Sequence, residues 1–347
     1  MVDRGILDVV MMFEIAMLVL AVGVFFTHGV WLFVTQKQFL RDMAGARDLL
    51  TRLLTRGTIN IEEINALRRV PRDAQVAAFL EAARNLAGTR KERLRFVAGE
   101  VALLDRARKL CRSRRWMRRL RGARVLARMD VVDPLIEKLL GDPNPAVRAQ
   151  SAEWAATHPT PAIISIMLGM LADPATQARF AVQDSLLRMG PTVANPLASF
   201  LETQTGLPAE SGLRVAESLA EPRFLPAALR HSASKEVGVR SAAANLLGAI
   251  GGASAAERLV QLLKDPDSLV RSAAARGLGR MQHWPAAAQL AECLRDSTWR
   301  VRRDAGLALR AIGAPGALFL RRALKGNDPF AADMSEQVLD LPAAAVG

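Results

Sequence analysis

Residues 265–275 read DPDSLVRSAAA, and close copies of this stretch recur along the chain. The copies DPNPAVRAQSA (142–152), DPATQARFAVQ (173–183) and DSTWRVRRDAG (296–306) align with it without gaps, and each has an arginine at its seventh position. Continuing the same alignment into the less similar repeats adds Arg118 and Arg240 at the equivalent position. The sequence numbers of the successive arginines differ by 30, 31, 61, 31 and 31, for Arg118, Arg148, Arg179, Arg240, Arg271 and Arg302. Because 61 is two periods, the spacing indicates stacked repeats that bury their apolar faces against one another.

One repeat unit reads as helix, turn, helix. Leu259, Leu262 and Leu263 form the apolar stripe of a first helix, and Asp265-Pro266 ends it. We expect the turn aspartate to cap the second helix, in which apolar residues recur at three- and four-residue spacing. Aromatic residues are only 5% of the chain and Tyr is absent, which favours helices packed through small side chains. The sequence therefore predicts an all-α fold, a right-handed α-solenoid of about seven helical hairpins behind a single N-terminal transmembrane helix.

The pattern resembles the HEAT repeat, and its short period resembles the HEAT-like repeats of phycocyanobilin lyases, over roughly residues 89–335. In that family the turn aspartate and the helix arginine form a stacked ladder along the solenoid. We interpret such a ladder as structural pairing between adjacent repeats, with an anion-binding groove as the alternative. The resemblance implies the same aspartate–arginine ladder here, from Asp142, Arg148, Asp173, Arg179, Arg240, Asp265, Arg271, Asp296 and Arg302. The repeat around Arg214 departs from the pattern because TQTGLPAE replaces the Asp-Pro turn, so we expect an irregular repeat there.

Residues 15–34, IAMLVLAVGVFFTHGVWLFV, carry no charge and are long enough to cross a hydrocarbon core of about 30 Å. Lys and Arg follow this stretch far more often than they precede it, which predicts an outside N-terminus and a solenoid in the cytoplasm. We expect a single-pass protein of the inner (cytoplasmic) membrane. The predicted organisation is a short extracytoplasmic tail (1–14), the transmembrane helix (15–36), a juxtamembrane helical region (37–88), the solenoid (89–335) and a C-terminal tail (336–347).

The net charge of +13 is concentrated in one place. Residues 104–128, here called the basic segment, hold eleven basic residues and one acid, Asp105, and should form the first repeat hairpin. Its solvent face fits anionic lipid headgroups, an acidic patch on a protein partner, or a merely solvated surface. Nucleic acid is disfavoured because the later repeats add little net charge. The candidate contact residues are Arg108, Lys109, Arg112, Arg114, Arg115, Arg118, Arg119, Arg121 and Arg124.

No motif for chemistry stands out. The sequence has no HExxH, P-loop or GxSxG motif and no His/Cys cluster with metal-ligand spacing. Cys111 lies among arginines, which makes a reactive thiol one alternative to a core position. We expect no enzyme and no cofactor, but a membrane-tethered scaffold that binds a protein partner, another inner-membrane component. A polysaccharide-synthesising glycosyltransferase complex is one such partner, although no residue argues for it. The alternatives are a membrane-held nucleic-acid-binding protein and a lyase-like enzyme.

Overall fold

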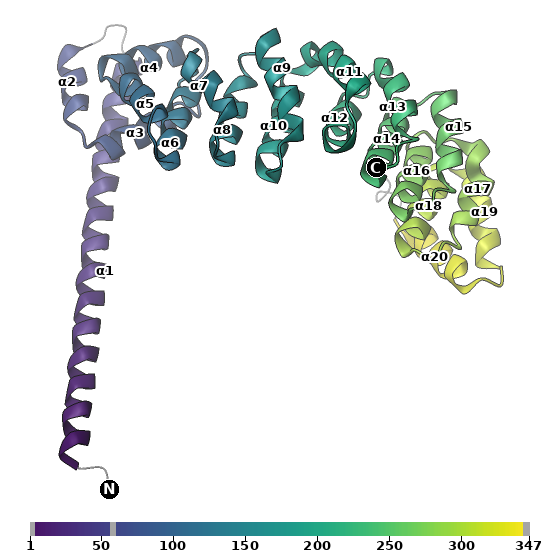
Figure 1. Ribbon diagram of the computed structural model, residues 1–347, viewed down its shortest axis with the longest axis horizontal. Coiled ribbons are helices and arrows are strands. Elements are labelled where there is room, and N and C mark those ends of the chain that lie inside the picture. The colour runs from purple at the N-terminus through teal and green to yellow at the C-terminus, as the bar shows by residue number, and fades with distance from the viewer. Residues whose placement is uncertain (1–3, 56–59, 343–347) are drawn as a thin grey trace. The chain divides into compact units, whose positions relative to one another are not determined.

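The computed structural model describes residues 4–55 and 60–342, and every regular element within these residues is helical (Figure 1). The all-α fold class predicted from the repeat is confirmed. The helices form two compact units, Met1–Leu135 (unit 1) and Ile136–Gly347 (unit 2). The predicted boundary at residue 88 lies within unit 1, at the first residue of a helix. Of the predicted tails, residues 1–3 and 343–347 lie outside the described residues.

Unit 1 consists of one long helix and a bundle of shorter helices packed on its C-terminal end. In the described residues they are α1 (Arg4–Thr55), α2 (Ile61–Arg69), α3 (Arg72–Ala82), α4 (Gly88–Glu100), α5 (Leu103–Cys111) and α6 (Trp116–Arg128). The C-terminal part of α1 packs against α2 and α3. Ala46, Leu50 and Leu53 of α1 are buried in that contact, so α1 is anchored in the core of the bundle.

Residues 16–41 of α1 project away from the bundle and pack against no other described part of the chain. Every side chain from residue 16 to residue 41 is exposed. Within the described part of the chain, α1 is the one helix long and apolar enough to cross a membrane, and its mean hydropathy reaches 2.2. The hydroxyls of Thr27 and Thr35 donate to the carbonyls of Gly23 and Trp31, at 2.9 and 2.8 Å. These polar groups are therefore satisfied inside the helix, as a lipid environment requires.

Unit 2 is an α-solenoid. From α7 to α20 the described residues form seven successive helical hairpins. Their second helices contact one another in order from α8 to α18, and the first helices form the other layer. The helices are α7 (Pro134–Lys138), α8 (Pro145–Ala155), α9 (Pro161–Gly169), α10 (Thr176–Arg188), α11 (Ala194–Thr203), α12 (Gly206–Leu219), α13 (Leu225–His231), α14 (Val237–Ile250), α15 (Ala253–Leu262), α16 (Ser268–Arg280), α17 (Ala287–Cys293), α18 (Trp299–Ala311), α19 (Ala314–Leu324) and α20 (Pro329–Asp340). Short 3₁₀ turns (η1–η5) precede or follow several of them.

Small residues let neighbouring second helices approach closely. A Cβ added to Gly248 of α14 would lie 2.4 Å from the Cα of Gly277 in α16. A Cβ added to Gly279 would lie 2.7 Å from the Cα of Ala308 in α18. Interiors packed to this density have no room for an extra methyl group without a backbone shift. These close contacts agree with the expectation of helices packed through small side chains.

The turns differ in one respect from the sequence expectation. Asp265 was expected to cap α16, but the N-cap residue is Asp267, whose carboxylate accepts from the amide of Leu269 at 2.8 Å. Asp265 lies two positions earlier and accepts from the amide of Asp267 at 2.9 Å. The intervening Pro266 extends the turn, so Asp265 orders the turn and Asp267 caps the helix.

Candidate functional site

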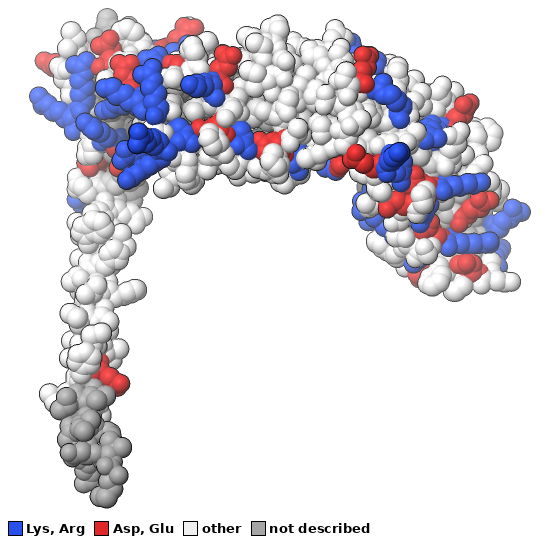
Figure 2. Space-filling model, viewed as in Figure 1, with Lys and Arg blue, Asp and Glu red and all other residues white. Residues whose placement is uncertain are grey.

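The basic segment occupies the hairpin of α5 and α6 in unit 1. Lys and Arg side chains gather over this bundle in the space-filling view (Figure 2). Arg108 and Arg119 are half-buried. The other candidate contact residues are exposed, namely Lys109, Arg112, Arg114, Arg115, Arg118, Arg121 and Arg124.

The start of α6 adds two large apolar side chains to this surface. Trp116 is 42% exposed and Met117 is 65% exposed. Met117 therefore lies outside the buried apolar stripe of α6. Because α6 begins at Trp116, its first turn faces solvent, and the stripe consists of later residues such as Val125 and Leu126, which are buried. The result is a surface on which arginines surround exposed apolar groups.

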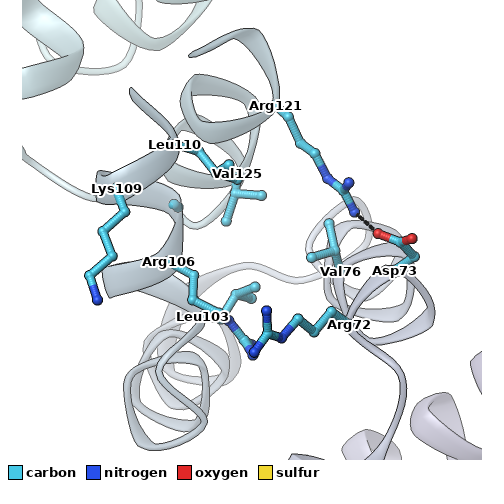
Figure 3. Close-up of a pocket in the computed structure, with 10 residues that line it drawn as sticks. Arg72, Asp73, Val76, Leu103, Arg106, Lys109, Leu110, Arg121 and Val125 are labelled. Carbon is cyan, nitrogen blue, oxygen red and sulfur yellow. Dashed lines mark hydrogen bonds and ion pairs between the residues drawn. The ribbon is translucent and has the colours of Figure 1, made fainter. Parts of the chain in front are cut away.

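A pocket with basic side chains at its edge lies between α3, α5 and α6 (Figure 3). It has a volume of about 290 Å³. Its apolar lining is Val76, Leu103, Ala107, Leu110 and Val125, and its polar lining is Arg72, Asp73, Arg106, Lys109 and Arg121. We call it the basic pocket. Arg121 of α6 and Asp73 of α3 form an ion pair that holds one side of it.

In unit 2 the ladder arginines pair with aspartates of the next turn. Arg148 donates to both carboxylate oxygens of Asp173, at 2.6 and 2.7 Å. Arg240 binds Asp265 in the same bidentate way at 2.9 Å through both nitrogens. The third such pair is Arg271 with Asp296, at 2.7 and 2.9 Å. The sequence separation is 25 in each pair, so every arginine reaches the turn of the following repeat.

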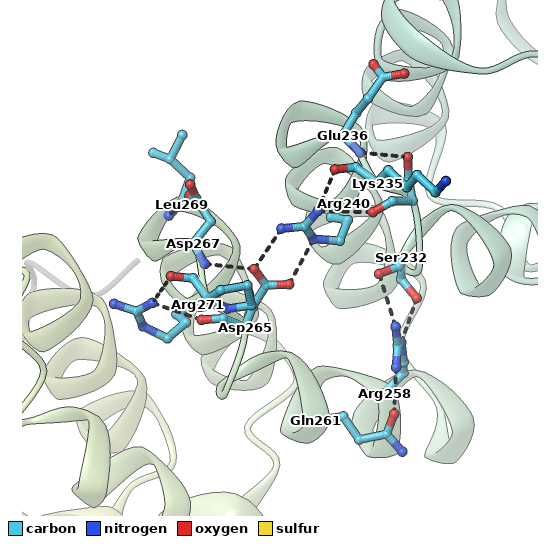
Figure 4. A network of polar contacts seen from close by, with 12 residues as sticks. Ser232, Lys235, Glu236, Arg240, Arg258, Gln261, Asp265, Asp267, Leu269 and Arg271 are labelled. Carbon is cyan, nitrogen blue, oxygen red and sulfur yellow. Dashed lines mark hydrogen bonds and ion pairs between the residues drawn. The ribbon is translucent and has the colours of Figure 1, made fainter.

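Each ladder arginine also binds its own turn, as Figure 4 shows for two successive rungs. Arg271 donates to the carbonyls of Asp265 and Pro266, both at 2.9 Å. Arg240 does the same at Ser234 and Lys235, at 3.0 and 3.1 Å. One guanidinium therefore joins two neighbouring turns, which is a structural use of its charge.

The electrostatics of the ladder favour the ionised pairs. Burial acts to raise the pKa of Asp173, but hydrogen bonds from Arg148 and the Ala175 amide hold that pKa below its ordinary value. The pKa of Asp296 is lowered in the same way, against burial, by Arg271 and the Thr298 amide. These carboxylates therefore stay charged to lower pH than an isolated aspartate.

The remaining predicted ladder residues make other contacts. Arg179 donates to the Asp173 carbonyl at 2.6 Å, and Gln204 stands where the next turn would supply an aspartate to it. Arg302 likewise donates to the Asp296 carbonyl at 2.8 Å, and its guanidinium lies 4.7 Å from the ring centre of Phe330. The carboxylate of Asp142 accepts from the amide of Asn144 at 2.8 Å.

The sequence alignment of the repeats missed one arginine–aspartate pair of the ladder. Arg108 of α5 donates to Asp133 at 2.7 Å, again with a sequence separation of 25, and also binds Asp105 at 2.9 Å. The alignment had assigned Arg118 to this repeat, but Arg118 is exposed on α6. The constant separation between an arginine and an aspartate was the signal that could have found the pair. Arg108 is thus held by two carboxylates, although it had been a candidate contact residue.

The two cysteines have environments that oppose thiolate formation. Both are buried, and burial raises the pKa of Cys111 and of Cys293 to about 11. A reactive thiol needs a pKa lowered toward neutrality. Within residues 11–14, 16–55 and 60–342, no group of three or more His, Cys, Asp or Glu side chains is placed to hold a metal ion.

The fold of unit 2 is an α-solenoid, and part of it matches a known repeat family. Residues 221–310 and 256–339 match the family model described as HEAT repeats, so this part of the chain consists of HEAT repeats. No curated protein matches the sequence.

Two solved structures with the same fold come from much longer chains. The structure of Kap121p bound to Nup53p matches 86% of this chain and 41% of its own, with a TM-score of 0.59 and 14% identity. The Kap95:Nup1 complex matches 86% of this chain and 49% of its own, with a TM-score of 0.54 and 11% identity. This chain therefore spans less than half the length of either. The complex of CpcE and CpcF of phycocyanin lyase from Nostoc sp. PCC7120 has a TM-score of 0.37 and 20% identity, over 60% of this chain and 94% of that one.

Proposed function

We propose that this protein is a non-catalytic scaffold, tethered to the inner membrane by α1, whose cytoplasmic solenoid binds a protein partner in that membrane. The observation that supports the tether is the unbroken course of α1. The same helix is wholly exposed and uncharged over residues 16–34 and is buried in the bundle from Ala46 onward. An exposed apolar stretch of this length has a large unfavourable contact with water, and a bilayer core of about 30 Å removes it.

The partner-binding proposal is supported by a pair of aromatic side chains in unit 2, here called the aromatic row. Trp299 begins α18, and Phe330 lies in the first turn of α20, at the equivalent position of the next repeat. Their exposed fractions are 53% and 58%. The helices α18 and α20 pack against each other, so the two residues lie on one edge of the solenoid.

Arginines accompany both rings. Arg303 lies 5.5 Å from the ring centre of Trp299, and Arg302 stacks on Phe330. Aromatic residues and arginine are the side chains most enriched where protein interfaces bind tightly. Two of the similar solenoids are likewise seen with protein partners, Kap121p with Nup53p and Kap95 with Nup1.

Affinity purification of the full-length protein from solubilised membranes tests this function. We expect one membrane protein to co-purify in a stoichiometric amount and to be lost in the Trp299→Ala/Phe330→Ala variant. Phe180→Ala is the matched control, because Phe180 is 52% exposed on α10, outside the aromatic row. Recovery of nucleic acid in place of a protein, or equal loss in the control, would overturn the proposal.

The tether has its own test. The full-length protein should stay in the membrane pellet after an alkaline wash, and a form that lacks residues 1–36 should be released. Release of both forms would show that α1 does not cross the bilayer.

A further inference from the structure

We propose that the basic pocket of unit 1 binds the phosphate of an anionic phospholipid, with the first carbons of the lipid against its apolar wall. The choice of a membrane lipid as the source of the phosphate rests on the tether proposed above. The pocket and its charge do not depend on it.

The charges at the pocket do not balance. Four cations and one carboxylate line it, and the carboxylate of Asp73 is paired with Arg121. Arg72, Arg106 and Lys109 form no ion pair with any side chain in residues 4–55 and 60–342. A phosphate supplies the missing negative charge and offers several acceptor oxygens to guanidinium groups.

Two of these cations lie near each other. Arg72 of α3 and Arg106 of α5 extend toward the same side of the pocket (Figure 3). Arg106 is half-buried and donates to Gln75, whose own amide donates to the Leu67 carbonyl at 2.9 Å. Two guanidinium groups held in proximity repel each other, and an anion placed between them removes that repulsion.

The shape of the pocket favours an amphiphile over a free anion. Its floor consists of apolar side chains from three helices, and Leu103, Ala107 and Val125 are each 2% exposed. A volume of about 290 Å³ is at the small end of ligand pockets, so it accommodates a headgroup and not a whole lipid. The remaining lipid would stay outside, as it does when the lipid is part of a bilayer.

The tether brings this pocket near a membrane surface. The pocket belongs to the same compact unit as α1, whose buried part, from Ala46 onward, packs on α3. The basic segment, which supplies part of the pocket lining, also carries the exposed Trp116, a side chain that favours the interface between water and lipid. Phospholipid is therefore the phosphate compound at the highest local concentration.

Native mass spectrometry of the full-length protein in neutral detergent measures the binding directly. Phosphatidylglycerol is added, and the fraction of protein with one bound lipid is followed. The test variant is Arg72→Gln/Lys109→Gln, which removes two exposed cations that hold no part of the fold. If each cation contributes about fivefold to the affinity, the double variant binds about 25-fold more weakly.

The matched control is Arg114→Gln/Arg118→Gln. It removes the same number of exposed charges from the part of the basic segment outside the pocket, so the pocket lining stays intact. Unchanged binding in this control supports a defined site. Equal weakening in both double variants would show diffuse attraction to the basic segment and would overturn the proposal.

A further variant and a competition measurement distinguish a lipid phosphate from free phosphate. Val76→Trp fills the apolar part of the pocket and keeps every cation, so it should abolish lipid binding. Unchanged lipid binding in Val76→Trp, or displacement of the lipid by an equal concentration of inorganic phosphate, would exclude the lipid assignment. Thermal unfolding of each variant confirms that it is folded. Because the experiment uses solubilised protein and no partner, its failure would leave the membrane-wash and co-purification results unaffected.

Discussion

Replacing Asp296 by alanine removes one complete rung of the ladder between α16 and α18. Loss of one member of a fully buried ion pair costs about 3–5 kcal/mol. The side chains of Arg271 and Asp296 are 15% and 11% exposed, and Arg271 keeps its bonds to its own turn. We therefore expect the free energy of unfolding to fall by about 2–3 kcal/mol, including the lost hydrogen bond to the Thr298 amide.

A double-mutant cycle with Arg271→Met separates the rung from these side effects. Urea unfolding of the full-length protein in detergent, followed by tryptophan fluorescence, gives the four free energies. We expect a coupling of about 1.5–3 kcal/mol, as for hydrogen bonds between charged groups. Arg179→Met is the internal control, since Arg179 binds a turn carbonyl but has Gln204 in place of the next aspartate. A coupling below about 0.5 kcal/mol, within the usual error of additivity, would refute the structural role of the ladder.

Three further predictions concern acidity, packing and the thiols. The pKa of Asp296 is lower in the folded state than its ordinary 3.8, so its contribution to stability is complete above pH 3.8 and disappears as the pH falls through the folded value. In the Asp296→Asn variant the free energy of unfolding should therefore depend less on pH in the acid range. An unchanged pH dependence would contradict this. Gly248→Ala places a methyl group against α16 and should reduce the free energy of unfolding by about 1–3 kcal/mol in the same urea assay. Gly169→Ala is the control and should leave that free energy nearly unchanged, because a Cβ added at Gly169 has no atom within 4 Å. Cys111 and Cys293 should resist alkylation at pH 8 and react after denaturation, and rapid labelling of the folded protein would show that they are accessible thiolates.

The repeat could be predicted from the sequence because its signal is local. The turn aspartate, the helix arginine and the apolar spacing all lie within one period, and α15 with α16 matches that pattern. The helix boundary was less well predicted, because the cap at Asp267 depends on how Pro266 extends the turn.

Features that depend on contacts between distant residues were not predicted. The partner of each ladder arginine lies in the turn of the next repeat, so the pair Arg108–Asp133 was missed when the alignment favoured Arg118. The basic pocket is formed in part by the ion pair of Asp73 with Arg121, whose sequence separation is 48. This separation is not a multiple of the repeat period, so the repeat pattern could not predict the pair.

The continuity of α1 has a mechanical consequence. A helix of 52 residues without proline, rising about 1.5 Å per residue, is about 78 Å long, far more than a bilayer core. Ala46, Leu50 and Leu53 near its C-terminal end are buried in the bundle, so α1 has no break at which the bundle could rotate independently of the exposed apolar stretch. In the proposed membrane-tethered state, a change in the tilt of α1 in a thinner or thicker bilayer would therefore be transmitted to unit 1. Bilayer thickness would then set the angle between unit 1 and the membrane.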